Sequence, residues 1–159
     1  MQALLSAASA TSALDLRTAA VRALGTTAWP EGADALRTAL ASASTPGHGD
    51  LGVHARCSLL QVAPTPEIFD ALLTQLEQLE TGKGAAELAF GSVLKRRAQQ
   101  ADVDPAATKD LNHWNQLGSK FGARPSVAGL TKRRQSRAAW LREHRDRLLA
   151  VAIELAGTR

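Results

Sequence analysis

Small and apolar residues recur at helical spacing near the start of the chain. Over residues 14–40 they fall every three or four positions, as in the segments LDLRTAAVRALG and ADALRTAL, which is typical of helices with one apolar face. Gly25 is suited to the end of the first helix, and Pro30 to the first turn of the second, where proline removes no hydrogen bond. The pattern therefore predicts a helical hairpin over residues 14–40.

The same pattern returns 36 residues further along the chain. At this offset Leu24 falls on Leu60 and Leu36 on Leu72. The other coincidences are Ala19 with Ala55, Val21 with Cys57, Pro30 and Glu31 with Pro66 and Glu67, Ala35 with Ala71, and Leu40 with Leu76. Repetition at such a period indicates stacked helical pairs that bury their apolar faces against one another. We therefore expect a second hairpin over residues 51–79, with Leu24 and Leu60 lining a shared seam.

The remaining sequence predicts one more hairpin and a terminal helix. The third hairpin comprises residues 85–101 and 106–117, with Asp104 capping its second helix. Residues 2–9 match the second helix of a further unit, so the chain either begins with a half-repeat or is a piece of a longer stack. After a basic, glycine-containing stretch, one long helix is expected from Lys132 to Ala156, charged in its first half and apolar in its second.

Two segments of the first hairpin resemble a HEAT repeat. In RTAAVRALG (17–25) a first helix opens with Arg and ends at Leu-Gly, and in PEGADALRTAL (30–40) a proline-led second helix carries paired leucines. The resemblance implies an all-α fold, a short right-handed superhelix of about three HEAT-like helical hairpins. Residues 1–117 would form the repeats, and residues 118–159 a basic connection and a C-terminal helix packed on them.

This expected fold predicts a function through its shape. A stack of helical pairs presents an extended concave face built from one helix of each pair, and such faces hold other macromolecules. We therefore expect a non-enzymatic interaction or scaffold module whose partner is another protein.

Composition agrees with an all-α chain and narrows the class of protein. Of 159 residues, 31 are Ala and 23 are Leu, whereas seven Val, two Ile and no Tyr are present, so an all-β fold is excluded. A single cysteine, no charged leader and no apolar run of about 20 residues predict a cytoplasmic protein that makes no membrane contact. No motif for catalysis, a cofactor or a metal is apparent, so we expect none of these.

Charge is distributed unevenly and suggests a second function. Residues 1–90 carry five basic and nine acidic side chains, a net charge of −4, whereas residues 91–159 carry fourteen and six, a net charge of +8. A basic half favours an anionic partner, and arginines suit phosphates because their guanidinium groups donate two hydrogen bonds at once. The alternative is therefore a protein that binds the nucleic-acid backbone through Lys95, Arg96, Arg97, Lys120, Arg124, Lys132, Arg133, Arg134 and Arg137.

Residues 117–134 resemble a degenerate helix-turn-helix motif. A helix would end near Leu117, the chain would turn at Gly122, and Pro125 and Ser126 would open a second helix rich in basic residues. Such motifs place their second helix in the major groove of DNA. The competing interpretation is a glycine-rich connection between the last repeat and the terminal helix.

Two smaller constellations have simpler interpretations. Asp110 and Trp114 are similar in kind to residues of alkylpurine DNA glycosylases, but their order along the chain is reversed, so we interpret Trp114 as a packing residue. His54 and Cys57 could share a metal, but Cys57 falls on the core position Val21, which predicts a buried thiol.

Overall fold

The chain folds as an all-α protein, as its composition predicts. The computed structural model describes residues 1–9, 12–27, 29–44, 49–78, 84–100 and 104–158, and within these ranges it contains helices and turns but no strand. The elements are α1 (Gln2–Ala7), α2 (Leu14–Thr27), the short 3-10 helix η1 (Pro30–Gly32), α3 (Ala33–Ser42), α4 (Gly49–Val62), α5 (Pro66–Gln78), α6 (Ala85–Ala98), α7 (Ala106–Ser119), α8 (Val127–Glu143) and α9 (Arg145–Gly157). No helix in the described part of the chain has the length and apolar character needed to cross a lipid bilayer.

The first two hairpins, α2–α3 and α4–α5, follow the 36-residue repeat. Leu24 and Leu36 are fully buried in one apolar cluster, and their counterparts Leu60 and Leu72 are buried in another. The repeat therefore places equivalent leucines in successive cores. The expectation of one seam shared by Leu24 and Leu60 is wrong, because the two leucines lie in different clusters: Leu24 packs in a cluster that α2 and α3 share with one side of α4, and Leu60 in a cluster formed with α5, α6, α8 and α9.

Gly25 has a different role from the one predicted. Helix α2 continues past it to Thr27, so Gly25 does not end the helix. It is buried where α2 lies beside α4, and a Cβ atom added there would lie 2.7 Å from the Cα atom of Ser58. The hydroxyl of Ser58 donates a hydrogen bond to the carbonyl oxygen of Val21 over 2.8 Å. The missing side chain of Gly25 thus lets the first helices of the two hairpins touch backbone to backbone.

The corresponding contact between the second and third hairpins uses a long side chain. Gln61, which stands where Gly25 stands in the first unit, donates from Nε2 to the carbonyl oxygen of Ala89 on α6 over 3.0 Å. Successive first helices are therefore joined in two ways: α2 and α4 meet at Gly25, where no side chain intervenes, and α4 and α6 are linked through the side chain of Gln61.

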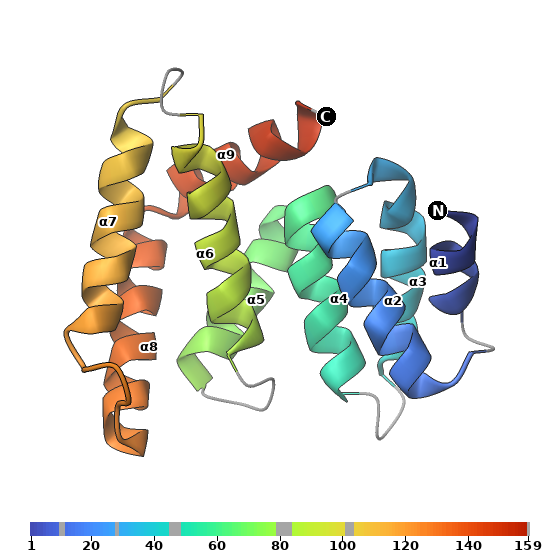
Figure 1. Cartoon of the computed structure of the whole chain (residues 1–159), viewed down its shortest axis with the longest axis horizontal. Helices are drawn as coiled ribbons and strands as arrows, with labels where there is room; N and C mark the ends of the chain where they lie inside the picture. The colour runs from blue at the N-terminus through green and yellow to red at the C-terminus, as the bar shows by residue number, and fades with distance from the viewer. Residues whose placement is uncertain (10–11, 28, 45–48, 79–83, 101–103, 159) are drawn as a thin grey trace.

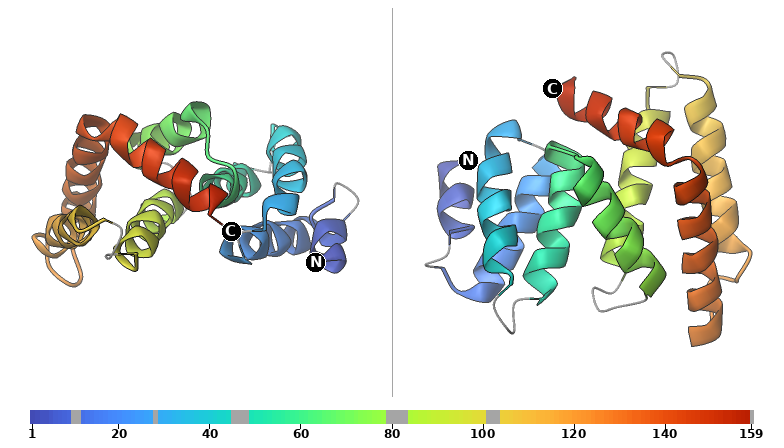
Figure 2. Two further views of the ribbon diagram at one scale, coloured as in Figure 1. Left: turned by 90° about the horizontal axis from the view of Figure 1, so that it is seen from above. Right: turned by 180° about the vertical axis from the view of Figure 1, so that it is seen from behind.

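The third hairpin, α6–α7, forms as predicted but does not extend the row of second helices. Seen from above, α3, α5 and α8 lie along one side of the molecule and α2, α6 and α7 along the other, with α4 between them (Figure 2). Helix α8, rather than α7, packs against α5. The right-handed HEAT-like superhelix remains a prediction, whereas the all-α fold is confirmed.

The expected single C-terminal helix is two helices. The backbone of His144 leaves the helical region, with φ −109° and ψ 19°, and α9 turns away from α8 at this point (Figure 1). The turn brings the apolar side chains of α9, among them Leu148 and Leu155, against α6 and α4. A straight helix would carry these side chains past the core, so their burial accounts for the break.

Candidate interaction surface

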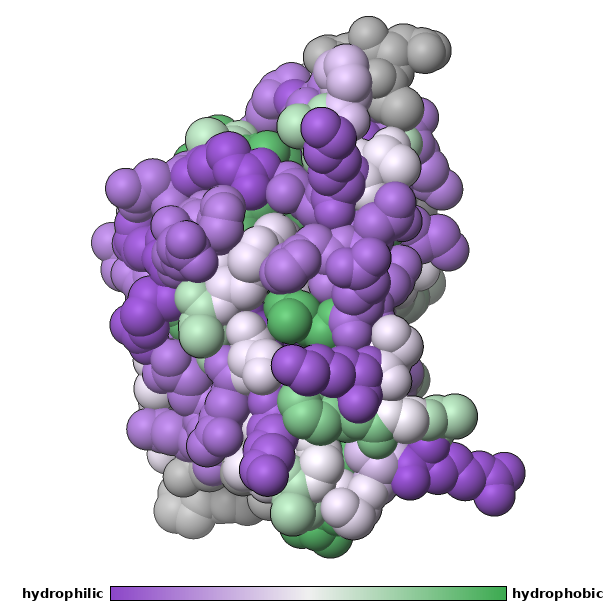
Figure 3. All heavy atoms as spheres, turned by 90° about the vertical axis from the view of Figure 1, so that its left-hand side faces the viewer, coloured by the Kyte–Doolittle hydropathy of each residue, from purple (hydrophilic) through white to green (hydrophobic). Residues whose placement is uncertain are grey.

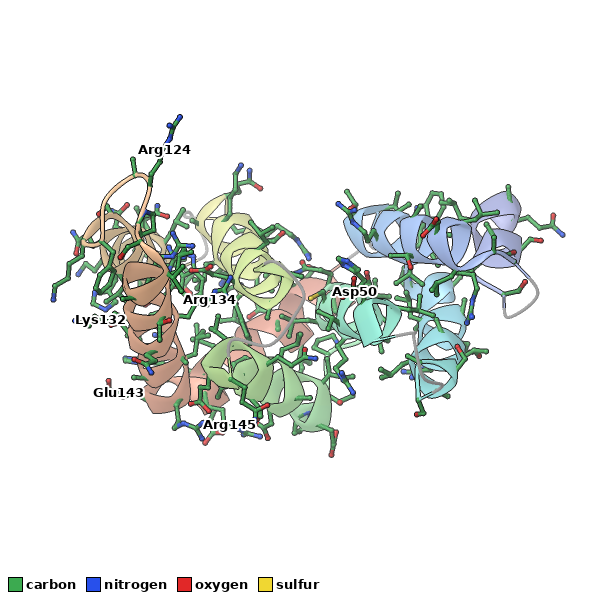
Figure 4. The ribbon with its side chains drawn as sticks, turned by 90° about the horizontal axis from the view of Figure 1, so that it is seen from below. Asp50, Arg124, Lys132, Arg134, Glu143 and Arg145 are labelled. Carbon is green, nitrogen blue, oxygen red and sulfur yellow. The ribbon has the colours of Figure 1, made fainter. Side chains whose placement is uncertain are left out.

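A groove lies between α2 and α6, with α4 as its floor. Figure 4 shows α4 set back between the two other helices, which are the first helices of their hairpins. The hollow, which we call the first groove, has a volume of about 280 Å3, close to the lower end of the volumes of small-molecule sites. Its lining is Arg22, Gly25 and Thr26 from α2, His54, Cys57, Ser58 and Gln61 from α4, and Ala85, Leu88, Ala89, Ser92 and Arg96 from α6.

Opposite walls of the first groove each carry an arginine. Arg22 stands exposed on α2, while Arg96 on α6 donates to Gln61 Oε1 over 3.1 Å and to the carbonyl oxygen of Leu155 over 3.0 Å. No carboxylate is among the described residues that line this groove. Leu88 stands on its rim with 75% of its surface exposed. The groove therefore combines positive charge with one prominent apolar side chain.

The floor of the first groove contains the histidine and cysteine considered as metal ligands. Burial, followed by the charge of Arg22, lowers the pKa of His54 below its usual value, so the imidazole is neutral at physiological pH. Burial also raises the pKa of the Cys57 thiol to about 12, so it stays protonated. The described residues contain no cluster of three or more His, Cys, Asp or Glu side chains that could hold a metal. Cys57 is partly buried against the core that holds Leu60, in line with its core interpretation.

A second groove runs along the other side of α6, facing α7 and α8. It has a volume of about 430 Å3. Its lining is Glu87, Leu88, Gly91, Ser92 and Lys95 from α6, Trp114 from α7, and Arg133 and Arg137 from α8. Leu88 and Ser92 line both grooves, so the exposed edge of α6 forms a ridge between them.

Three arginines of α8 converge on one buried carboxylate of α6. Arg133 donates two hydrogen bonds to Glu87, from Nε over 2.9 Å and from Nη2 over 3.0 Å, and Arg137 forms a further ion pair with the same carboxylate. Arg134 approaches Glu87 only to 3.9 Å and points from α8 toward α6 (Figure 4). Arg137 also stacks over Trp114, with its guanidinium carbon 4.2 Å from the ring centre, and donates to the Trp114 carbonyl over 2.9 Å. This cluster joins α6, α7 and α8.

Most predicted nucleic-acid contacts are engaged within the fold or separated from one another. Arg96, Arg97, Arg133, Arg134 and Arg137 are partly buried among protein groups, and Arg97 pairs with Asp104 and Glu154. Lys95, Lys120, Arg124 and Lys132 are exposed. In Figure 4, Arg124 projects from the turn before α8, Lys132 lies on the outer side of α8 and Arg134 points inward. The nine residues therefore do not form one continuous patch.

Part of the charge difference between the two halves of the chain is neutralised by ion pairs between them. Arg142 pairs with Glu77, and Arg145 pairs with Asp70 over 2.6 Å, so α8 and α9 are tied to the acidic helix α5. Hydrophilic side chains still cover most of the end formed by α7 and α8 (Figure 3). The charge difference is visible in the sequence but these ion pairs are not, because their partners lie 65 and 75 residues apart in the sequence.

The helix-turn-helix candidate forms an αα-hairpin. The chain turns at Gly122, whose φ is 84°, and Ser126 caps α8 by accepting a hydrogen bond from the backbone N–H of Gly129 over 3.2 Å. Helices α7 and α8 run antiparallel side by side (Figures 1 and 2), whereas the helices of the DNA-binding motif cross at about 90–120°. Part of α8 also faces α6 through the Glu87 cluster. The arrangement therefore differs from that of a recognition helix in the major groove of DNA.

The pair of residues compared with DNA glycosylases is part of the packing. Asp110 forms an ion pair with Arg147 on α9, and Trp114 is buried. Both residues therefore help to hold α7 on the rest of the fold.

Comparisons with models of known protein families, with curated proteins and with solved structures find no match for this chain. The two grooves on either side of α6 are therefore the candidate binding sites of this protein. Sequence reasoning missed Arg22, Gln61, Glu87 and Leu88 as surface or cluster residues. One local signal was present in the sequence: the second unit has Gln61 where the first has Gly25, which indicates that the contact to the next unit differs.

Proposed function

We propose that the protein is a non-enzymatic interaction module that binds an acidic segment of another protein in the first groove. The observation that carries the proposal is the groove itself: two arginines on opposite walls, no lining carboxylate in the described chain, and Leu88 exposed at the rim. A partner with an apolar side chain flanked by carboxylates would complement it.

The physical argument joins charge with apolar contact. An exposed leucine that becomes covered on binding contributes roughly 1.5–3 kcal/mol, and arginines at an interface favour carboxylate partners because their hydrogen bonds are charge-assisted. Arg96 is held in place by Gln61 and the Leu155 carbonyl, so little freedom is lost when it accepts a partner. The neutral His54 on the floor adds no charge, so the attraction for carboxylates comes from the two arginines.

The proposal is tested by selecting peptides from a displayed library against the whole protein. We expect the selected peptides to carry Asp or Glu around an apolar residue. Leu88→Asp, which removes the apolar contact and adds a like charge, should weaken their binding by at least about tenfold. Leu16→Asp is the matched control, because Leu16 is 53% exposed and lies outside both groove linings.

Two outcomes would contradict the proposal. Selected peptides without an acidic bias would remove the role of the arginines, and equal binding by the Leu88→Asp and Leu16→Asp variants would place the binding site elsewhere. A salt-dependent affinity for duplex DNA that exceeds the affinity for every selected peptide would favour the nucleic-acid alternative. That alternative rests on the exposed cations Lys95, Lys120, Arg124 and Lys132.

A further inference from the structure

The second groove presents a hydrogen-bond donor that no described residue uses. Trp114 is only 4% exposed, and its indole N–H forms no hydrogen bond with any residue in the described ranges. The N–H is not among the fully buried side-chain atoms that lack a partner, so solvent reaches it in the groove, where a tryptophan N–H ordinarily finds an acceptor. Trp114 lines the second groove, so a ligand bound there can supply one.

Gly91 leaves the space through which the indole N–H is reached. A Cβ atom at this position would lie 3.1 Å from Trp114 Nε1, closer than to any other atom around it. A glycine in the middle of a helix weakens the helix, and here its missing side chain leaves the N–H edge of the indole uncovered beside α6; we call this uncovered edge the notch.

Positive charge surrounds this notch. Lys95, Arg133 and Arg137 line the same groove, and Arg134 stands next to them, with its buried Nε atom 3.9 Å from Glu87 and without a hydrogen bond. Four cations face one carboxylate, that of Glu87, which leaves a net charge of +3. Glu87 already accepts hydrogen bonds from Arg133 and Arg137, so it has little capacity left for the other donors.

We propose that the second groove binds the terminal phosphate of a phosphate monoester. Trp114 Nε1–H and Lys95 donate to the phosphate oxygens, and the arginines around Glu87 supply the surrounding positive charge. A phosphate monoester carries a charge of about −1.5 to −2 at neutral pH, which matches the excess charge better than the single charge of a carboxylate. A phosphodiester carries a single negative charge and therefore matches the excess positive charge less well.

The experiment follows the indole resonances of the intact protein by two-dimensional 1H–15N NMR. The chain has three tryptophans, and a Trp29→Phe and a Trp140→Phe variant assign the Trp114 signal. Phenyl phosphate is the probe, with phenol as the neutral control. We expect saturable movement of the Trp114 signal with phenyl phosphate and none with phenol.

Matched variants separate the notch from general electrostatics. Gly91→Ala should weaken phenyl phosphate binding by at least about tenfold, because the new methyl group fills the notch. Gly157→Ala makes the same change in another helix, where nothing lies within 4 Å of the new atom, and should leave binding unchanged. Lys95→Ala, at an exposed position, should weaken binding several-fold.

The source of the phosphate is resolved by two further probes. Tighter binding of a phosphoserine peptide than of inorganic phosphate supports the proposal and assigns the ligand to a modified protein segment. Tighter binding of inorganic phosphate supports the site and assigns it to a small phosphate compound.

Three results overturn the proposal. They are a Trp114 signal that no phosphate moves, a Gly91→Ala variant that binds phenyl phosphate as the wild type does, and a duplex DNA that moves the signal at lower concentration than phenyl phosphate. None of these results depends on the first groove, because Gly91, Lys95 and Trp114 do not line it.

Discussion

The close approach of α2 and α4 at Gly25 gives the sharpest test of how the repeat is assembled. Gly25→Ala would place a methyl carbon 2.6 Å from the Cβ atom of Ser58 and 2.7 Å from its Cα atom. Real carbon atoms do not approach so closely, and the Cα atom belongs to the backbone. The side chain of Ser58 cannot relieve the contact by rotating, so α2 and α4 must move apart.

The expected cost follows from three contributions. Overpacking of a well-packed contact costs about 1–3 kcal/mol, and separating the helices strains the Ser58 hydrogen bond to Val21, which contributes about 1 kcal/mol. Against these, alanine favours the helix over glycine by about 0.8–1 kcal/mol. The Gly25→Ala variant should therefore be less stable than the wild type by about 1–3 kcal/mol.

The measurement is urea unfolding of the two proteins followed by tryptophan fluorescence and circular dichroism. Gly157→Ala is the control for helix propensity, because its new atom meets open space. For a domain of this size the loss should lower the melting temperature by roughly 2–4 °C per kcal/mol. A Gly25→Ala variant as stable as Gly157→Ala would refute the claim that α2 and α4 touch at this glycine.

Two further predictions concern charge. Glu87→Gln removes the carboxylate that three arginines face and should destabilise the protein by about 3 kcal/mol in urea unfolding, because buried cations lose their counter-charge; a cost below about 0.5 kcal/mol would contradict the cluster's role. Since burial and Arg22 lower the pKa of His54, the unfolded state binds more protons just below the ordinary His value of 6.5, and stability should fall as the pH decreases through that value. His54→Gln should flatten this part of the stability profile measured from about pH 7.5 to 5, and an unchanged slope would argue against a desolvated His54.

The repeat could be predicted from sequence because it depends on local spacing. Apolar residues at intervals of three and four define the faces of α2 to α5, and the 36-residue offset places Leu60 and Leu72 in the same relation as Leu24 and Leu36. These features are properties of single helices and of neighbouring helices. They require no knowledge of distant contacts.

The candidate sites could not be predicted in the same way. The first groove depends on how far α6 stands from α2, and that distance is set by the backbone contact at Gly25 and the reach of Gln61. The cluster at Glu87 brings together residues 46 and 50 positions apart. A charged residue on an isolated helix gives no sign of which distant side chain it will meet.

The sequence alone determined that this chain is helical, that two of its hairpins are copies of one pattern, and that its charge is divided between its halves. Only the tertiary structure decided that α8 takes the place beside α5, that the terminal helix breaks at His144, and that most arginines pair with carboxylates inside the molecule. The physical reason is the distance along the sequence over which each kind of interaction acts. Helix formation and apolar periodicity act over a few residues, whereas docking and ion pairing are settled by the sum of many contacts between segments that meet only after the chain has folded.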